Sequence, residues 1–236
     1  MSIYSTQLRL RNRDVNLHRV LRTSILFELM QEASIRHTEE LGMGREMTLD
    51  RGLLWMVTHQ QAEITRMPLY DERITLESWP GKTMHLLFPR FYRMLDEQGQ
   101  VLLRASSLWA LVDSGTRRMV FPDRHGIVIE GVETGEEAAL PATPRRAAGG
   151  EARAFTVPFS YVDLNGPMNN TRYFDLAEDL IPAAAERRQL CRASVEYACE
   201  ARLGERLSIG VEEDGGRFYI SGDGEKKIFR MVMEYR

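Results

Sequence analysis

The sequence YVDLNGPMNNTRY, residues 161–173, is the stretch about which the rest of the chain is organised. Asp163 and Asn165 are turn formers. Asn169 and Asn170 are typical helix caps, and the apolar residues after them recur at helical spacing. The stretch therefore predicts two polar side chains in a loop that leads into a helix, whose free backbone N–H groups favour a developing negative charge. Taken alone, the loop is equally typical of an Asx-rich turn before a capped helix.

One order of elements occurs twice around this stretch. In the first half, strand-forming residues 3–13 precede apolar residues three and four apart, which predict a helix from Ser24 to near Gly42. Strand-forming runs follow at residues 53–65, 73–79, 84–95, 101–112 and 119–121. In the second half, the expected order is a strand at 154–161, a helix at 170–181, a short helix from Pro182 to Arg188, and strands at 190–200, 206–212, 217–221 and 226–235.

Residues 130–150 separate the two halves with Gly, Glu, Ala and Pro and little periodicity. We therefore expect an N-terminal unit at residues 1–129, a linker at 130–152 and a C-terminal unit at 153–236. A single long helix can cover the apolar face of a curved antiparallel sheet, which is the hotdog arrangement. The expected fold class is α+β, a double hotdog in which the two sheets join edge to edge and thereby lose two exposed edges.

Composition limits the classes of function. The chain has 236 residues, of which 43% are hydrophobic, and a formal net charge of -3, so a sizeable core is expected and nucleic acid is not an expected ligand. No apolar run approaches the roughly 20 residues of a membrane span, and the first residues do not resemble a secretory signal. Cys191 and Cys199 fall on one predicted strand and are expected to be reduced and buried in a cytoplasmic protein. The five histidines lack metal-ligand spacing, so we expect no metal and no cofactor.

Several short segments, in order and spacing, resemble the acyl-acyl-carrier-protein (acyl-ACP) thioesterases, the plant plastid and bacterial enzymes that release free fatty acids. The resemblance covers nearly the whole chain. It rests on LMQEA (29–33), LWMVT (54–58), ESWPG (77–81), RASSLW (104–109), TRRM (116–119), NNTRY (169–173) and VEY (195–197). The resemblance implies a double hotdog fold, which agrees with the repeat.

The family's loop pattern is Asp, any residue, Asn, any residue, His, one further residue, then Asn-Asn. Asp163 and Asn165 match its first positions, whereas Pro167 stands at the histidine position and has no proton to give or accept. Glu200 matches an acidic residue that the family carries on the strand after the helix. Many plant members have a cysteine beside it, but Cys199 is one residue early and would face the other side of a strand, so no thiol role is carried over.

The resemblance implies hydrolysis of fatty acyl thioesters in fatty acid biosynthesis. Glu200 or Asp163 would activate water as the general base, Asn165 would orient the water or the thioester, and backbone N–H groups of residues 169–171 would stabilise the oxyanion. A thiol has a pKa of about 8.5, so its thiolate leaves readily. A positioned acid or base contributes roughly a hundred- to ten-thousand-fold in rate, so loss of the histidine predicts a slow enzyme or an altered mechanism. His18 in the similar loop DVNLH (14–18) matches the position of Pro167, but is expected at the pseudo-symmetric site.

The resemblance also implies the partner and the place of the acyl chain. The partner is an acidic acyl carrier protein, for which the pairs 117–118, 145–146, 187–188 and 226–227 are candidate contacts, although such pairs are more often simply a solvated face. In the family the N-terminal hotdog shapes an apolar tunnel. Met30, Trp55 and Met56 could line it or simply pack in the core.

Two other functions remain open from the sequence. Pro167 favours a non-catalytic protein that binds an acyl chain or acyl-ACP. A thioesterase for acyl-CoA or an aromatic thioester is the other alternative. The acyl chain length and the presence of a homodimer are also open.

Overall fold

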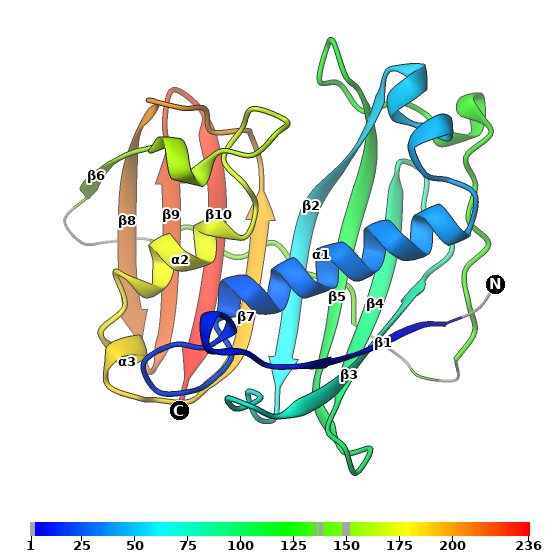
Figure 1. The fold of residues 1–236 in the computed structure, drawn as a ribbon. Helices are drawn as coiled ribbons and strands as arrows, with labels where there is room; N and C mark the ends of the chain where they lie inside the picture. The colour runs from blue at the N-terminus through cyan, green and yellow to red at the C-terminus, as the bar shows by residue number, and fades with distance from the viewer. Residues whose placement is uncertain (1–2, 135, 137–138, 148–151) are drawn as a thin grey trace.

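A single antiparallel sheet organises the fold of the computed structural model, which describes residues 3–134, 136, 139–147 and 152–236. The strands of this part of the chain run in the order β1-β3-β4-β5-β2-β7-β10-β9-β8-β6 (Figure 1). Their bounds are β1 (Tyr4–Arg9), β2 (Leu53–Ile64), β3 (Arg73–Pro80), β4 (Leu87–Leu95), β5 (Val101–Asp113), β6 (Arg153–Thr156), β7 (Leu190–Tyr197), β8 (Arg206–Asp214), β9 (Arg217–Asp223) and β10 (Lys227–Tyr235).

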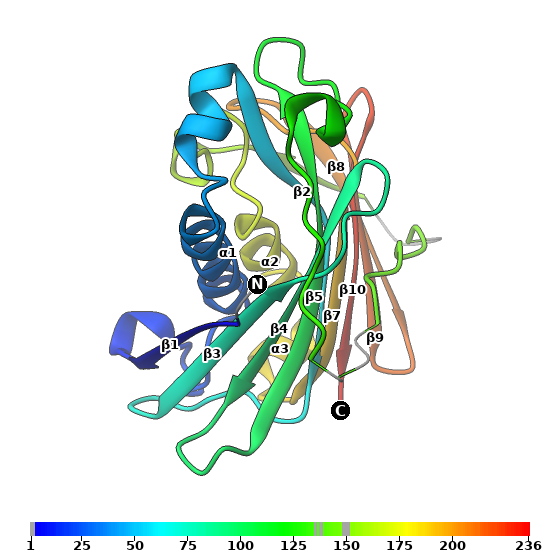
Figure 2. The same cartoon turned by 90° about the vertical axis from the view of Figure 1, so that its right-hand side faces the viewer.

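The helices lie together on the concave side of this sheet (Figure 2). They are α1 (Thr23–Glu40), α2 (Arg172–Glu178) and α3 (Pro182–Ala185). The strands from the first half of the chain form one side of the sheet and those from the second half form the other, and β2 pairs with β7 between them. Each half is thus a meander wrapped around a helix, which confirms the predicted double hotdog and its edge-to-edge junction.

The core is continuous across the two halves. The apolar stripe of α1 that the sequence predicts is buried, with Leu26, Phe27 and Met30 fully covered. The Phe27 ring stacks on that of Phe174 in α2, with ring centroids 4.1 Å apart and an angle of 2° between the planes. Because aromatic pairs at this distance add to the energy of burial, the two helices hold the halves together from inside.

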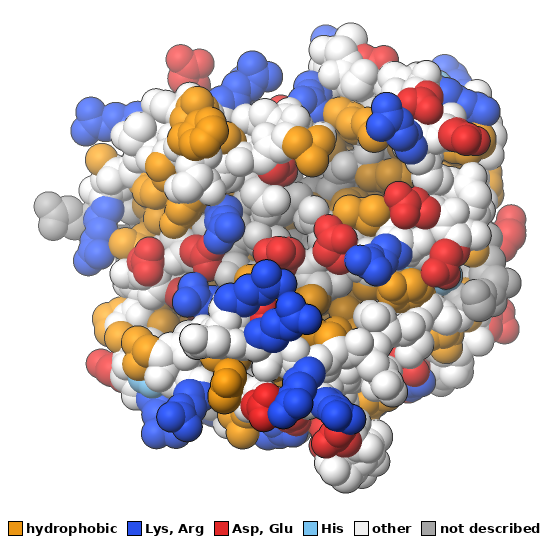
Figure 3. All heavy atoms as spheres, viewed as in Figure 1, with side chains coloured by type: hydrophobic (Ala, Val, Ile, Leu, Met, Phe, Trp, Pro, Cys, Tyr) orange, Lys and Arg blue, Asp and Glu red, His pale blue; other side chains and the backbone are white. Residues whose placement is uncertain are grey.

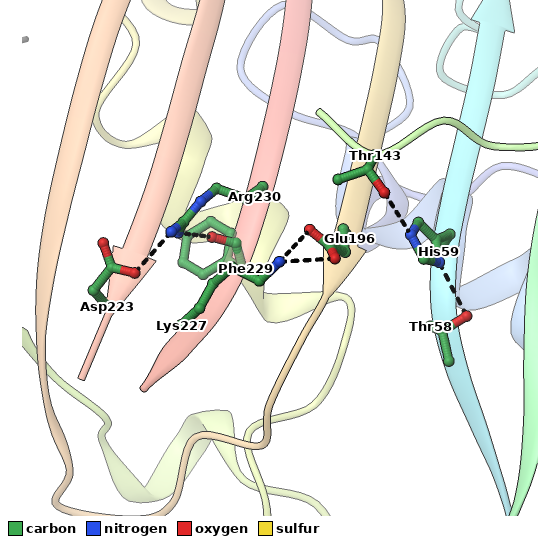
Figure 4. A network of polar contacts seen from close by, with 8 residues as sticks. All are labelled: Thr58, His59, Thr143, Glu196, Asp223, Lys227, Phe229 and Arg230. Carbon is green, nitrogen blue, oxygen red and sulfur yellow. Dashed lines mark hydrogen bonds and ion pairs between the residues drawn. The ribbon is translucent and has the colours of Figure 1, made fainter. Parts of the chain in front are cut away.

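The described part of the linker packs on the convex face of the sheet (Figure 4). Thr143 Oγ1 lies 3.1 Å from Nε2 of His59 on β2, and the Ser194 hydroxyl of β7 donates to the Ala142 carbonyl oxygen at 3.2 Å. Arg145 forms a two-pronged ion pair with Glu212 of β8. The segment therefore crosses the β2–β7 junction on the side away from the helices.

Several predicted elements are shorter in the structure, among them the first strand, which ends at Arg9, and the short second helix, which ends at Ala185. The strand expected at residues 154–161 ends at Thr156, because Pro158 has no N–H to continue the ladder, and Phe159–Tyr161 form one turn of 3₁₀ helix. Residues 119–121 form no strand but a single bridge from Met119 to Val112. Of the helix expected at 170–181, only residues 172–178 are helical, as α2. None of the helices in the described ranges has the length and apolar character that crossing a membrane requires.

The end of β7 also differs from the prediction. The N–H groups of Ala198 and Cys199 both point to the Ile228 carbonyl oxygen, at 2.8 and 3.2 Å, so the ladder stops and the chain turns away. Glu200 is therefore not on a strand, and the alternation of faces used to judge Cys199 does not apply there. Cys191 is half-buried on β7 and Cys199 is exposed beyond it, so the expectation that both are buried on one strand is wrong.

Candidate active site

The loop at residues 162–168 is closed by its own backbone. Val162 and Met168 form a bridge, the Asp163 N–H donates to the Pro167 carbonyl at 3.1 Å, and the Gly166 N–H returns to the Asp163 carbonyl at 3.0 Å. Gly166 has a φ of 94°, which glycine adopts without steric cost. The Asp163 carboxylate also accepts the Asn165 N–H at 2.8 Å. This Asx turn fixes both polar residues at one end of the sheet.

A cavity of about 90 Å³ beside this loop gathers the three predicted site residues. Asp163, Asn165 and Glu200 all line it, and so does Pro167. The opposite wall is the start of β2, at residues 54–57, so the two halves of the chain both contribute. Cys199, the exposed neighbour of Glu200, also lines the cavity. The three residues named from the sequence are therefore neighbours in the structure, although Glu200 reaches the cavity from the irregular segment after β7.

Arg117 is the site residue that sequence reasoning missed. It follows β5 in the first half of the chain, yet its Nη2 donates to the Asn165 carbonyl at 2.9 Å. Its Nη1 lies 3.6 Å from Oε1 of Glu200, whose side chain is only 17% exposed. One guanidinium therefore holds the loop and the carboxylate together. The family-like segment TRRM contains Arg117, and that was the available signal.

The backbone donors at the start of α2 are only partly free. Asn169 does not cap the helix at the expected position, since Thr171 is the N-cap residue. Instead the Asn169 side-chain oxygen accepts the N–H and the hydroxyl of Thr171, at 2.9 and 2.8 Å. The Asn169 N–H donates to the Tyr161 carbonyl at 2.8 Å. Within the described residues, the Asn170 N–H is the member of the expected group 169–171 that has no protein acceptor.

Tyr197 joins the start of α2 to the first half of the chain. Its hydroxyl lies 2.9 Å from the Asn170 carbonyl oxygen and 3.0 Å from Oε1 of Gln60 on β2. Burial raises the pKa of Tyr197 well above its usual value, so the hydroxyl remains protonated and available as a donor. The residue thereby fixes Asn170 beside the cavity.

The loop before α1 repeats this backbone geometry in a register that differs from the sequence prediction. The Asn16 N–H donates to the Val20 carbonyl at 2.9 Å, as the Asp163 N–H donates to the Pro167 carbonyl. The φ of Arg19 is 62°, in the place of Gly166. Val20, and not His18, therefore corresponds to Pro167. The alignment of the two five-residue sequences used in the sequence analysis was shifted by two residues.

His18 lies at the other end of the molecule. Its loop, in dark blue, is at the lower end of Figure 1, whereas the loop at 162–168, in yellow-green, is at the upper end. His18 Nε2 is 3.0 Å from the Ala185 carbonyl oxygen, and His18 lines a separate cavity of about 250 Å³ with Glu178 and Tyr235. It cannot supply the imidazole that the loop with Pro167 lacks.

A second, apolar cavity of about 270 Å³ adjoins the first. The two share Leu54, Trp55 and Asn165 as lining residues. Its walls are mainly apolar side chains from α1, β4, β5 and neighbouring loops: Ile35, Met43, Leu49, Pro80, Phe88, Pro89, Trp109, Ile129 and Leu164. Of the expected tunnel residues, Trp55 lines both cavities and Met56 lines the first, while Met30 is fully buried in the core.

The expected docking residues are spread over several surfaces, and Arg187 and Arg188 line the separate cavity with His18. Arg146 pairs with Asp223 at 3.1 Å. Lys227 forms two contacts with Glu196, at 2.9 and 3.0 Å, on the convex face (Figure 4). Arg117 and Lys226 instead lie beside the small cavity, around a wider hollow that Arg202, Arg206 and Glu200 also line. Acidic and basic side chains are interspersed over the face shown in Figure 3.

Comparison with protein families shows two adjacent matches. The family described as "Acyl-ACP thioesterase N-terminal domain" matches residues 2–122, and "Acyl-ACP thioesterase C-terminal domain" matches residues 145–232. A chloroplastic acyl-acyl-carrier-protein hydrolase of Cuphea viscosissima is 26% identical over 239 residues, which cover 95% of this chain and 57% of the relative. The chain spans little more than half the length of such curated plant relatives.

Two solved structures share the whole fold. An acyl-ACP thioesterase from Bacteroides thetaiotaomicron has a TM-score of 0.86 and 20% sequence identity, covering 99% of this chain and 98% of that chain. The 12:0-ACP thioesterase from Umbellularia californica has a TM-score of 0.79 and 21% identity, covering 99% and 97%. At these identities the likeness establishes the double hotdog architecture.

Proposed function

The chain belongs to the acyl-ACP thioesterase family, and on that basis we propose that it hydrolyses fatty acyl-ACP to a free fatty acid and holo carrier protein in fatty acid biosynthesis. One observation carries the proposal. A small cavity with Asp163, Asn165 and Glu200 opens beside a larger apolar cavity, so a reacting polar end and an acyl tail have adjacent places. Concave apolar sites with a few convergent polar groups are typical of ligand binding.

The reaction needs a base for water and a donor for the oxyanion. In the proposed step, water attacks the thioester carbonyl carbon while its proton passes to Glu200 or Asp163. The carbonyl oxygen becomes an oxyanion, which the Asn170 N–H stabilises. Collapse of the intermediate breaks the carbon–sulfur bond and releases the carrier thiolate, which takes up a proton. Asn165 orients the water or the thioester.

Pro167 determines the expected rate. The carbonyl of Pro167 is used in closing the loop, and its ring offers no proton at the place of the family histidine. A thiolate with a pKa near 8.5 needs little protonation to leave, so hydrolysis remains feasible. We expect turnover below that of family members with the histidine by roughly a hundred- to ten-thousand-fold.

The carrier protein is the proposed macromolecular partner. Arg117, Arg202, Arg206 and Lys226 line the hollow next to Glu200, together with Glu205 and Glu225, and the four cations suit contacts with an acidic surface. The division into residues 1–129, 130–152 and 153–236, and a cytoplasmic location, are parts of the same proposal; the free thiols support the location. A homodimer would extend the sheet through its edge strands β1 or β6.

Thiol release from a panel of acyl-ACPs of increasing chain length tests the proposed activity. The expected result is slow but saturable release with a preferred chain length. The same acyl groups on CoA separate the two carriers, because the proposed contacts with the cations of this hollow need the protein part of ACP. Faster release from acyl-CoA at every length would assign the chain to the acyl-CoA alternative.

The non-catalytic alternative rests on Pro167. It predicts that acyl-ACP binds and no thiol is released, and that Pro167→His raises release from zero. Binding is measured separately, from the retention of acyl-ACP on the immobilised protein. Release by the unmodified protein above the rate of a heat-denatured sample excludes this alternative.

A further inference from the structure

Arg90 on β4 is a buried cation on the wall of the apolar cavity. It is only 4% exposed and lines the cavity of about 270 Å³. Its Nε donates to the Ser78 hydroxyl at 2.8 Å, and its Nη1 donates to the Thr38 hydroxyl at 3.3 Å. Nη2 is buried with no hydrogen-bond partner. Two of the five N–H donors of this guanidinium are therefore engaged. Both of their acceptors are uncharged hydroxyl groups.

No carboxylate in the described ranges forms an ion pair with Arg90, although Glu39 of α1 also lines the cavity. The ion pairs of the described residues do not include Arg90, whereas Arg93, three residues along the same strand, pairs with Glu77 and Glu136. Burial lowers the pKa of Arg90, since the surrounding protein does not offset the lost hydration. Buried charges are normally paired, because an unpaired one is costly to remove from water.

The hydroxyl groups of Ser34, Tyr92 and Ser107 form a chain of hydrogen bonds with one another. Ser34 donates to the Met30 carbonyl at 2.8 Å, so the Tyr92 hydroxyl donates to Ser34 at 2.6 Å. The Ser107 hydroxyl then donates to Tyr92 at 2.9 Å and receives the Trp109 indole N–H at 2.8 Å. None of the side chains in this series of hydrogen bonds carries a negative charge. Ser34 and Thr38 line the same cavity as Arg90, so part of its wall is polar, and a plain hydrocarbon tail would leave that part unused.

We propose that the preferred acyl chain carries an oxygen acceptor at its far end, most favourably a carboxylate, and that Arg90 binds it. The inference rests on the proposed function, since the thioester is taken to lie at Asp163 and Glu200 while the tail passes Trp55 into the apolar cavity. The free N–H groups of Arg90 suit a carboxylate, whose charge would complete a buried ion pair. A hydroxyl at the end of the acyl chain would accept from one donor of Arg90 and leave the charge of the guanidinium unpaired.

The size of the cavity restricts the chain. Its volume of about 270 Å³ lies just below the range of roughly 300–1,000 Å³ for small-molecule sites. A short or medium acyl chain therefore suits it, with the far oxygen reaching the polar wall.

The kinetic test uses three acyl-ACPs with the same number of carbons, ending in methyl, hydroxyl and carboxyl groups. The expected order of kcat/KM is carboxyl, hydroxyl, methyl, with roughly ten- to hundredfold between the first and last, as for a hydrogen bond to a charged group. In Arg90→Met the carboxyl preference is lost, while Arg93→Met, the same change on the same strand at a residue paired outside the cavity, retains it. A methyl-ended substrate equal to or better than both others in the unmodified protein overturns the proposal.

A binding test separates this inference from the proposed function. Trp55 and Trp109 line the cavity, so tryptophan fluorescence reports its occupancy without turnover. The ligands are a fatty acid methyl ester and the monomethyl ester of the dicarboxylic acid of equal length, in which the reacting end is masked. Tighter binding of the half-ester by tenfold or more supports the proposal, even if no thioester is hydrolysed. Equal binding overturns it. If Arg90→Met does not fold, Arg90→Lys replaces it and is expected to keep a reduced preference for the half-ester. Equal binding of the two ligands by the unmodified protein overturns the proposal whether or not either variant folds.

Discussion

The guanidinium of Arg117 lies 3.6 Å from the carboxylate of Glu200, although the two residues come from opposite halves of the chain. Arg117 also donates to the backbone of the loop that carries Asn165, at 2.9 Å. A positive charge from the N-terminal half therefore fixes the orientation of two groups from the C-terminal half. The cavity that they line depends on the junction between β2 and β7, and neither half would form it alone.

Removing this contact should slow hydrolysis. We predict that Arg117→Ala lowers kcat by roughly ten- to hundredfold, because Glu200 and Asn165 lose their common anchor. Arg118→Ala, at the exposed neighbouring position, is the matched control and should leave kcat near the original value. Equal kcat in both variants, measured with the best acyl-ACP, would show that Arg117 does not position the site.

Restoring an imidazole should accelerate the reaction and change its pH dependence. In Pro167→His the rate is expected to rise by tenfold or more, with a new dependence on pH near 6.5, the ordinary pKa of histidine. The unmodified protein should lack that limb in the same range. The check is kcat/KM between pH 5.5 and 8.5. A folded variant whose profile overlays the original one would contradict a catalytic role for this position.

The stability of the protein should fall in mild acid because of His37. This side chain is fully buried, and burial, together with the charge of Arg90, lowers its pKa to about 4. Below pH 6.5 the His37 imidazole binds a proton in the unfolded chain but not in the folded chain. The free energy of unfolding therefore decreases as the pH falls from 6.5 towards 4. In His37→Leu this part of the pH dependence of Tm should disappear, whereas His85→Asn, an exposed position, should keep it.

The stacked pair of Phe27 and Phe174 should make both halves unfold together. Phe174→Ala is expected to reduce the free energy of unfolding by about 3–5 kcal/mol, in a single transition, because it leaves a cavity where α1 meets α2. Phe159→Ala, at a side chain that is 80% exposed, should change it by less than about 0.5 kcal/mol. Two separate transitions in a urea titration would refute a shared core.

The repeated order of elements was readable because apolar spacing is a local property. It predicted α1, the meanders and the α+β double hotdog, and it predicted the loop with Asp163 and Asn165. The ends of elements were less accurate where a single backbone contact decides them. The strand with Tyr197 stops because two N–H groups turn to the Ile228 carbonyl, and nothing in the sequence around Glu200 indicates this.

Residues that act across the fold could not be assigned from the sequence. Arg117 is far from Glu200 along the chain, so its contact depends on the pairing of β2 with β7. Arg90 follows an ordinary strand pattern, and only the structure shows that it is buried without a carboxylate. His18 was matched to Pro167 from five similar letters, whereas the backbone hydrogen bonds align Val20 with that proline.

The most direct test of the proposed chemistry is thiol release in a single turnover from acyl-ACP, compared among the unmodified protein, Asp163→Asn and Glu200→Gln. These changes keep the size of each side chain and remove its basicity. We predict release by the unmodified protein and a decrease of a hundredfold or more in the variant that lacks the general base, with all three proteins still binding acyl-ACP. Unchanged release in both variants, or none from the unmodified protein with acyl-ACP bound, would contradict hydrolysis at this cavity.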